Sequence, residues 1–583
     1  MSRPRTYLLI VFCLLALPSL AAAQEAAARN TEDANAAEKQ GLELLDTIAE
    51  GIPSLRSSGN RVYLMSAVAD LLWNKDEKRA RGLFEMVKQE IAAALATIDP
   101  GDQQSSATLE MLQQRRRECL DRMARRDPEM ALAFLRATRP PLRSTDNNQQ
   151  ANETNLELHL ASLVAVQDPE QALRLGRAAL RRGVSYPLIP LLSQMAGKNK
   201  EMAQTLHREI VERLRNEDLT KNSEAANAAW NLLFAFPPPQ ATEDTYRELV
   251  EILASLVLSA ASNPAMRNAQ NYYNQFPSLM PQVEKYAPAR VPMLRQLAQS
   301  INRNADPNSR MYQELNQIAQ RGTVEDILAL AGKYGPEFQT QIYQQAAWKA
   351  VSGGDVNRAR QIVSEFITEP AQRQQMLQQF DNQLLWNSVN QGKIAEVRQL
   401  LVKMRSMEQR VQILVNLAGN VANKGDQKQA LGLLAEARAI LDPSPVNLAR
   451  FTAQLQLAQG YSSLDAQQSV ALIQPIIIQI NQLVAAAVVL DGFENRYLQD
   501  GEWMKPAFTG LGNLVNNIEQ NLGMLALKDV DGARALSDQL ERPEIRLMAQ
   551  LEIAQAVLGK INSNSRPPNR FESGSFTRRV VRE

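Results

Sequence analysis

Hydrophobic positions along this chain follow the period of an α-helix. Apolar residues recur every three or four positions through most of the sequence, and Gly and Pro lie mainly between these periodic segments. Such spacing places apolar side chains on one face of a helix. Ala, Leu, Gln, Arg and Glu, which favour helices, dominate the segments, and no alternating β-branched run is flanked by turn residues. The pattern predicts an all-α fold with short loops.

One helix–turn–helix pattern recurs along the chain. A periodic helix leads into a turn that carries Asp or Gly-Asp, and a second helix follows with a small residue near its start. The clearest copy runs from Arg410 to Pro443, and further copies start at Arg61, Arg115, Glu153, Gln341 and Arg373 and near Asn521. Because one helix pair cannot bury its apolar stripe alone, neighbouring pairs must stack. We predict an α-solenoid of stacked antiparallel helix pairs.

Residues in the turns support this prediction. A glycine before the Asp can adopt the left-handed conformation that ends the first helix, as at Gly354 and Gly425. The Asp side chain can then cap the second helix, as expected for Asp127, Asp168, Asp355 and Asp426. Small residues that allow close helix approach follow at Ala131, Ala172, Ala359, Ala430 and Ala533.

The copy from Val411 also matches a known repeat pattern. The matching positions are Leu414, Leu417 and Ala418 in the first helix, Ala430 and Ala437 in the second, and Pro443 after it. This segment resembles a tetratricopeptide repeat, with Leu414 and Val421 in place of the signature Trp and Tyr. Other copies depart further from the family period of about 34 residues. The resemblance implies a right-handed solenoid whose concave surface holds peptide or protein.

Breaks in the repeat rhythm predict the domain organisation. A proline-rich stretch at 263–309 is expected to connect an N-terminal lobe at 24–262 with a tetratricopeptide-like lobe at 310–562, and to contain a short helix from Val291 to Asn302. The polar, Arg-rich tail at 563–583 is predicted to be disordered.

The first residues predict export. Arg3 and Arg5 precede an apolar run at 7–17, Pro18 follows, and Ala21-Ala22-Ala23 suits signal-peptide cleavage after residues 1–23. The run is too short for the roughly 20 residues of a membrane span. We therefore expect a mature protein in the periplasm or outside the cell, beginning near Gln24. Cys119 would be its single cysteine, which excludes an intramolecular disulfide, and we expect it to be buried.

Composition narrows the functions. The net charge is +1 and aromatic residues make up 5% of the chain, so neither a general nucleic-acid surface nor many stacking platforms are expected. The only histidines are His159, among leucines and expected to be packed, and His207, in a charged segment and expected to be solvated. Neither lies in a zinc-binding motif. We predict no catalytic, cofactor-binding or metal-binding residues.

Two adjacent segments interrupt the repeats near the C-terminus. The strongly apolar stretch at 470–490 contains Gln474, Pro475 and Gln479, which favours a helix buried on most sides over a membrane span. The insertion at 491–508 then combines aromatic and charged residues, as interface anchors do. Its candidate partner-binding residues are Phe493, Arg496, Tyr497, Trp503 and Phe508. The alternative is that these aromatics cover the core beneath an irregular loop.

These features favour a non-enzymatic scaffold of a bacterial envelope that binds protein or peptide. The alternative is a glycan-active enzyme or a glycan-binding helical toroid. That alternative requires two carboxyl groups about 5–10 Å apart in an aromatic-lined cleft.

Overall fold

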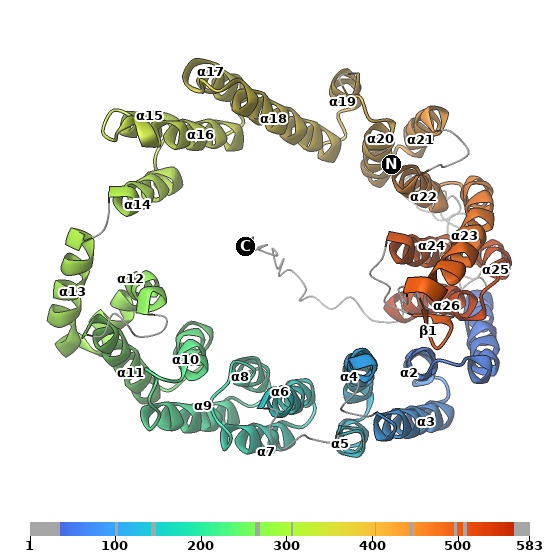
Figure 1. The fold of residues 1–583 in the computed structure, drawn as a ribbon, viewed down its shortest axis with the longest axis horizontal. Helices are drawn as coiled ribbons and strands as arrows, with labels where there is room; N and C mark the ends of the chain where they lie inside the picture. The colour runs from blue at the N-terminus through green and yellow to red at the C-terminus, as the bar shows by residue number, and fades with distance from the viewer. Residues whose placement is uncertain are drawn as a thin grey trace, which may run out of the picture. The chain divides into compact units, whose positions relative to one another are not determined.

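The structure is a computed structural model of the full chain. It describes residues 35–98, 103–140, 147–262, 269–304, 307–402, 404–441, 447–494, 498–504 and 510–564. The predicted signal peptide and most of the predicted tail lie outside these residues. Within them the fold is all-α apart from one two-stranded hairpin, as the hydrophobic pattern predicts. Helices that follow one another in the chain pack as pairs, for example α20 with α21 (Figure 1).

Contacts divide the chain into two units. Unit 1 combines residues up to Arg115 with residues from Ser388 onward, and unit 2 spans Arg116–Asn387. Unit 1 contains a helix at 35–51, η1 (Ile52–Ser54), α2 (Ser58–Leu72), α3 (Glu77–Ala96), α19 (Ile394–Leu401), α20 (Met407–Asn423), α21 (Gln427–Ile440), α22 (Leu448–Ser462), α23 (Ala466–Glu494), β1 (Leu498–Gln499), β2 (Glu502–Trp503), α24 (Gly510–Ala526), α25 (Val530–Ser537) and α26 (Pro543–Asn564).

Unit 2 is a continuous stretch of the chain. It contains α5 (Pro128–Ala137), α6 (Asn147–Val164), α7 (Pro169–Leu180), α8 (Leu188–Ala196), α9 (Lys200–Arg215), α10 (Ser223–Ala235), α11 (Glu243–Ser262), α12 (Ala269–Tyr286), η2 (Pro288–Arg290), α13 (Val291–Asn304), α14 (Pro307–Arg321), α15 (Val324–Leu330), α16 (Pro336–Ser352) and α17 (Val356–Phe366). Two further helices, α4 (Gln103–Arg126) and α18 (Pro370–Asn390), contain the residues at which the units divide.

These units differ from the lobes predicted at 24–262 and 310–562. The N-terminal helices do not pack only with their sequence neighbours, because α2 also packs against α26 near the other end of the chain. The preceding helix at 35–51 also approaches α26 closely: a Cβ added at Gly51 would lie 2.8 Å from the Leu547 side chain. The segment at 263–309 lies inside unit 2 and is mostly helical, since α12 accommodates Pro277 and Pro281 and α13 extends to Asn304.

The predicted turn chemistry is confirmed. Gly354 and Gly425 have φ angles of +87° and +95°, in the left-handed region. The carboxylates of Asp127, Asp168, Asp355 and Asp426 each accept a hydrogen bond from a backbone N–H three residues later. The alanines at 131, 172, 359, 430 and 533 are fully buried. These local rules therefore place each second helix on its partner.

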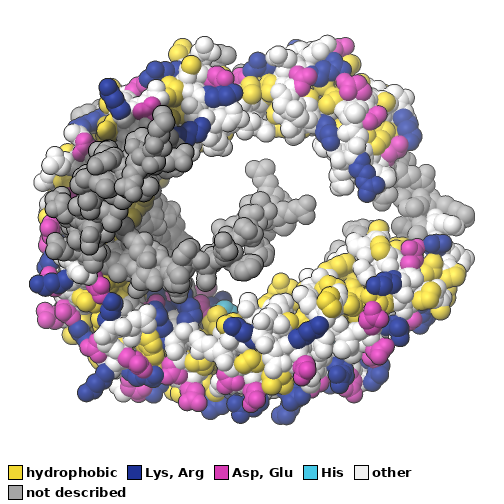
Figure 2. All heavy atoms as spheres, turned by 180° about the vertical axis from the view of Figure 1, so that it is seen from behind, with side chains coloured by type: hydrophobic (Ala, Val, Ile, Leu, Met, Phe, Trp, Pro, Cys, Tyr) yellow, Lys and Arg dark blue, Asp and Glu magenta, His cyan; other side chains and the backbone are white. Residues whose placement is uncertain are grey.

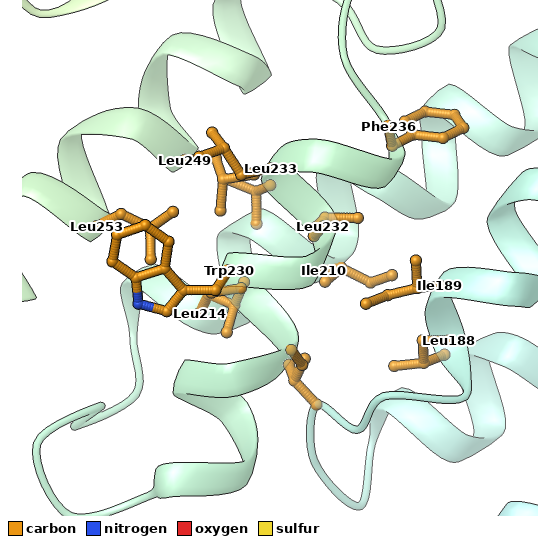
Figure 3. Packing of buried hydrophobic residues seen from close by; sticks show 14 of the residues in the cluster. Leu188, Ile189, Ile210, Leu214, Trp230, Leu232, Leu233, Phe236, Leu249 and Leu253 are labelled. Carbon is orange, nitrogen blue, oxygen red and sulfur yellow. The ribbon is translucent and has the colours of Figure 1, made fainter. Parts of the chain in front are cut away.

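Unit 2 has an apolar core in which α8 to α12 meet. Figure 3 shows Leu188, Ile189, Ile210, Leu214, Trp230, Leu232, Leu233, Phe236, Leu249 and Leu253 packed between these helices. Full burial of one such side chain contributes about 1.5–3 kcal/mol. The core also holds His207, which is 0% exposed and whose ring lies 5.1 Å from that of Phe236. The prediction that His207 is solvated is therefore wrong.

The long apolar helix α23 is a repeat helix with one open face. By length and composition it is the one helix among the described residues that could cross a membrane. Its buried side chains include Ile473, Ile477 and Val484, and it packs against α22, α24 and α25. Ile478 and Val489 are 56% and 67% exposed, so the helix is buried along one face and not on most sides. Its packing beside α22 identifies it as the second member of a pair.

Candidate functional site

The insertion at 491–508 separates its predicted site residues. Phe493, at the end of α23, is 87% exposed, whereas Trp503 is 2% exposed in β2. Arg496, Tyr497 and Phe508 lie outside the described residues. The structure therefore does not bring Phe493 and Trp503 together on one surface. The burial of Trp503 fits the alternative in which the aromatics of this segment cover the core.

A tight β-hairpin forms the middle of this insertion. Leu498 pairs with Trp503 and Gln499 with Glu502. The two residues between the strands, Asp500 and Gly501, have φ angles of +55° and +77°. Positive φ at both positions defines the type I′ turn that Asp-Gly favours between antiparallel strands. The Asp500-Gly501 dipeptide is the sequence signal for this hairpin, which the helical periodicity does not predict.

Two buried carboxylates in this region bind the chain's own backbone. Glu502 is 6% exposed and accepts hydrogen bonds from the backbone N–H of Arg56 at 2.6 Å, the backbone N–H of Ser57 at 3.1 Å and the Asn60 amide at 3.2 Å. Glu544, 2% exposed, accepts from the Trp503 backbone N–H at 2.9 Å. Acidic residues at and beside the hairpin thus join the start of α2 to the start of α26.

A second feature of unit 1 is a surface of uncharged amides. In Figure 1, α20, α22 and α24 lie in a row, with α21, α23 and α25 along their other side, and α22 contacts both α20 and α24. Exposed or half-buried amides occupy the open faces of these three first helices. They are Gln409, Gln412, Asn416 and Asn420 on α20, Gln456 and Gln459 on α22, and Asn513, Asn517 and Gln520 on α24. We call this set the amide face.

A small cavity of about 130 Å³ lies within the amide face, between α22 and α24. It is lined by Thr452, Leu455, Gln456, Gln459, Asn517, Gln520 and Asn521. Asn521 is 6% exposed, and its Nδ2 donates to the Asn517 carbonyl at 2.8 Å. Its Oδ1 has no hydrogen-bond partner among the described residues. The cavity therefore combines several donors and acceptors with one buried acceptor that is unsatisfied.

Charged side chains of neighbouring second helices pair with one another in both units. Arg398 of α19 lies 2.8 Å from Glu436 of α21. In unit 2, Arg177 of α7 lies 2.6 Å from Glu209 of α9. Figure 2 shows Lys and Arg interspersed with Asp and Glu over the described residues of one face of the molecule. Exposed ion pairs of this kind contribute about 0–1 kcal/mol each, and here they connect second helices of neighbouring pairs.

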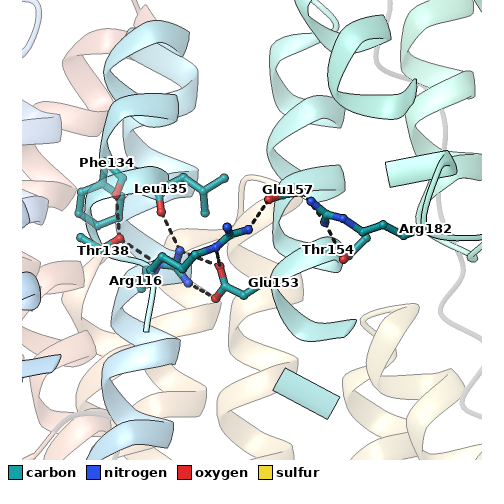
Figure 4. Close-up of polar contacts among 9 residues, drawn as sticks. Arg116, Phe134, Leu135, Thr138, Glu153, Thr154, Glu157 and Arg182 are labelled. Carbon is teal, nitrogen blue, oxygen red and sulfur yellow. Dashed lines mark hydrogen bonds and ion pairs between the residues drawn. The ribbon is translucent and has the colours of Figure 1, made fainter. Parts of the chain in front are cut away.

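The most buried ion pair among the described residues lies in unit 2. Arg116 and Glu153 are 2% and 5% exposed, and Figure 4 shows them in bidentate contact. The Arg116 guanidinium also donates to Thr138 Oγ1 at 2.9 Å and to the Leu135 carbonyl at 2.8 Å. The partners of Arg116 shown in Figure 4 therefore lie in α5, in α6, and at Thr138 just after α5. This arrangement connects α4 with α5 and α6.

The two histidines exchange the environments predicted for them. Burial lowers the pKa of His207 to about 4, which keeps its ring uncharged in the core. His159, predicted to be packed, has a side chain 43% exposed, with Nε2 2.5 Å from Asp121 Oδ1. No cluster of three metal-ligating side chains occurs among the described residues. Cys119 is buried, as expected.

Comparisons with known proteins give no family. No protein-family model matches the chain, and no curated protein matches it at a significant level. One similar solved structure is a chain of a homology model of the full-length AP-3 complex in an intermediate open conformation, with 11% identity, 90% of this chain and 93% of that chain covered, and a TM-score of 0.21. Another is a circular tandem repeat protein with novel repeat topology and enhanced subunit contact surfaces. It is 13% identical, 91% of this chain and 98% of that chain are covered, and the TM-score is 0.14. At these TM-scores neither likeness bears on fold or function.

Proposed function

We propose that this helical-repeat protein is a non-enzymatic scaffold of the bacterial cell envelope that binds protein or peptide segments on its amide face. The observation that carries the proposal is the row of uncharged amides along the open faces of α20, α22 and α24. Charged residues of these and neighbouring helices pair with one another, as Glu408 of α20 does with Arg450 of α22 at 3.7 Å and Arg398 of α19 does with Glu436 of α21 at 2.8 Å.

The chemistry of the amide face matches a polypeptide main chain. Each Asn or Gln side chain offers both a donor and an acceptor, as each peptide unit does. Helices packed about 8–10 Å apart span roughly three residues of an extended peptide. A bound segment could therefore meet α20, α22 and α24 in turn. Each neutral hydrogen bond contributes only about 0.5–1.5 kcal/mol net, so several must act together for measurable affinity.

A binding assay tests this proposal directly. The probe is a fluorescein-labelled 12-residue peptide of Gly, Ser, Asn and Val with blocked ends, whose residues carry no charge. Replacing Gln412, Asn416, Gln456 and Gln459 by Ala removes four amides without disfavouring the helices. We expect the dissociation constant to rise at least tenfold in fluorescence anisotropy. Unchanged binding by this variant would contradict the proposal.

The matched control lies on α21. Gln427 and Gln429 are exposed amides of a second helix, outside the amide face. Their replacement by Ala should leave the affinity for the probe unchanged. An equal loss in both variants would assign the effect to amides in general and not to this face.

The envelope location rests on the sequence of residues 1–23, with a basic start, an apolar run and small residues at the expected cleavage site. Sequencing the N-terminus of protein purified from native cells should give Gln24 as the first residue. A mature protein that begins at Met1 would overturn this part of the proposal.

A glycan-active enzyme is less well supported by the cavities of the described residues. The cavity beside Glu209 and Glu212 has no aromatic wall. A second cavity, beside Trp230 and Phe234, has no carboxyl group in its lining. Neither combines the paired carboxyls and aromatic walls that glycoside hydrolysis requires.

A further inference from the structure

The open face of α23 forms an apolar stripe. Five large apolar side chains are exposed there, by fractions that run from 39% for Leu483 to 87% for Phe493. A regular helix places residues three, four and seven positions apart on one face. By that spacing the middle of the open face is formed by six exposed residues, with Leu483 and Leu490 beside them: Ile478, Gln482, Ala485, Ala486, Val489 and Phe493. We call these six residues the α23 stripe.

The neighbouring second helices differ from α23 in charge. In the row of second helices α23 follows α21 and precedes α25 (Figure 1). Exposed charges occur on both neighbours, at Lys428 and Arg438 of α21 and at Asp531 of α25. Along α23 the sequence has no charged residue from 466 to 490. An exposed apolar patch of this kind indicates a surface that another molecule covers.

The residues of the α23 stripe are arranged symmetrically about its middle. The two alanines at 485–486 form the centre, Gln482 and Val489 each lie three positions from it, and Ile478 and Phe493 each lie seven positions from it. An antiparallel copy of the same helix, centred on the alanines, would therefore place Ile478 against Phe493. It would likewise place Gln482 against Val489. This reciprocal pairing is what a two-fold contact between identical chains requires, and small central residues allow the two helices to approach closely.

The exposed area is sufficient for a specific contact. The five large apolar side chains together expose the equivalent of about three whole side chains, which is roughly 500 Å² of apolar surface in each copy. Two copies would remove about 1,000 Å² from water, the size at which specific protein interfaces begin.

Charge favours a second copy over a membrane surface as the occupant of the stripe. Helices that lie on a bilayer carry Lys or Arg beside their apolar face, because anionic lipids attract these side chains. The charged residues nearest to the stripe along the chain are Asp465, Asp491 and Glu494, all of them acidic. An anionic lipid surface would repel them, whereas the uncharged stripe meets a second stripe without any contact between like charges.

We propose that the α23 stripe is the contact between two copies of this chain. The two α23 helices pack antiparallel about a two-fold axis at Ala485 and Ala486. The contact lies on a second helix of unit 1 and uses none of the amide face, so it stands whether or not the proposed function holds.

Sedimentation equilibrium of the full-length protein tests the contact. The wild type should reach twice the chain mass of 64.9 kDa as its concentration rises through the micromolar range. Ala485→Glu places a carboxylate at the centre of the contact, where it loses its water, so the dissociation constant of the dimer should rise at least tenfold. Ala485 is exposed and glutamate favours helices, so the chain itself should fold normally. A monomeric wild type, or a dimer that this substitution does not weaken, would overturn the proposal.

The matched control lies on α21. Ala435→Glu makes the same change at an exposed alanine outside the α23 stripe and should leave the dissociation constant unchanged. An equal rise in both variants would remove the stripe from the contact and overturn the proposal.

Two further measurements test the orientation and the occupant. Ala486→Lys should also weaken the dimer, whereas a mixture of the Ala485→Glu and Ala486→Lys proteins should dimerise again, because the antiparallel arrangement sets the new carboxylate beside the new ammonium group. No recovery in the mixture would contradict the antiparallel arrangement. Binding of a monomeric wild type to phosphatidylcholine vesicles, abolished by Ala485→Glu, would assign the stripe to lipid and overturn the proposal.

Discussion

The Glu502 carboxylate accepts a 2.6 Å hydrogen bond from the backbone N–H of Arg56, a residue 446 positions earlier in the chain. The neighbouring N–H of Ser57 donates to the other carboxylate oxygen. Both donors lie directly before Ser58, the first residue of α2. Backbone N–H groups at the start of a helix lack partners within the helix. Glu502 thus caps a helix from the opposite end of the sequence. A segment with the composition of a partner-binding site serves here as an intramolecular contact.

Replacing Glu502 by Gln should weaken this contact without changing its shape. The amide loses the negative charge and turns an NH2 group toward backbone donors, so we expect unit 1 to lose about 2 kcal/mol of stability. Hydrogen exchange at the amides of Arg56 and Ser57 should accelerate accordingly. Glu541→Gln, at an exposed position near the start of α26, serves as the control and should leave exchange at these amides unchanged. Equal protection in the Glu502 variant and the wild type would show that the charge does not matter.

The Arg116–Glu153 pair should behave as a buried unit. Glu153→Ala leaves the guanidinium buried without its counter-ion, and we expect a loss of about 3–5 kcal/mol in urea unfolding. The double variant Arg116→Met/Glu153→Leu removes both charges and should be more stable than Glu153→Ala alone. If the costs of Arg116→Met and Glu153→Leu, each made singly, simply add in the double variant, the two side chains are not coupled.

Stability should fall in mild acid because of His207. Its folded-state pKa is lowered to about 4, whereas an unfolded histidine has a pKa of about 6.5. Above pH 6.5 the ring is neutral in both states and has no effect. As the pH falls from 6.5 to 4 the unfolded chain binds a proton that the core excludes, so roughly 3 kcal/mol of stability is lost. Urea unfolding of His207→Leu across this range should show a shallower pH dependence than the wild type, and identical slopes would refute the assignment.

Two glycines of the same repeat should respond in opposite ways to Ala. Gly425 has a φ of +95°, which strains any side chain, so Gly425→Ala should destabilise unit 1 by about 1 kcal/mol. Gly432 lies inside α21, and a Cβ there would meet nothing within 4 Å. Gly432→Ala should therefore stabilise by about 0.5–1 kcal/mol. Thermal unfolding of the two variants gives the comparison, and a loss of stability at Gly432 would contradict the packing described here.

Local features of the fold could be predicted from the sequence because they depend on residues a few positions apart. Asp426 caps the backbone N–H of Gln429, and Gly425 ends the preceding helix. The histidines show where such reasoning failed. The charged residues beside His207 in the sequence predict a solvated side chain, although Ile210, Val211 and Leu214 share its helical face and are buried. The helical period of apolar residues predicts the burial of His207 better than its immediate neighbours in the sequence do.

The candidate sites could be predicted only in part. Pairing of Glu502 with Arg56 depends on how distant helices pack, and no spacing in the sequence encodes it. The hairpin strands are two residues long, too short for a periodic signal, although Asp500-Gly501 marks the turn. The amide face becomes visible only when α20, α22 and α24 are placed side by side.

The packing of α2 against α26 also has a consequence for how the chain is made. A ribosome releases the N-terminal helices first, and all of unit 2 before the last helix of unit 1. The partners of the apolar surface of α2 and of the N–H donors at Arg56 and Ser57 are therefore synthesised last. Contacts between residues so distant in sequence slow folding, and they leave apolar surface that is prone to aggregation exposed until folding is complete. Newly made chains of this protein should accordingly depend on chaperones until residues 498–564 have emerged.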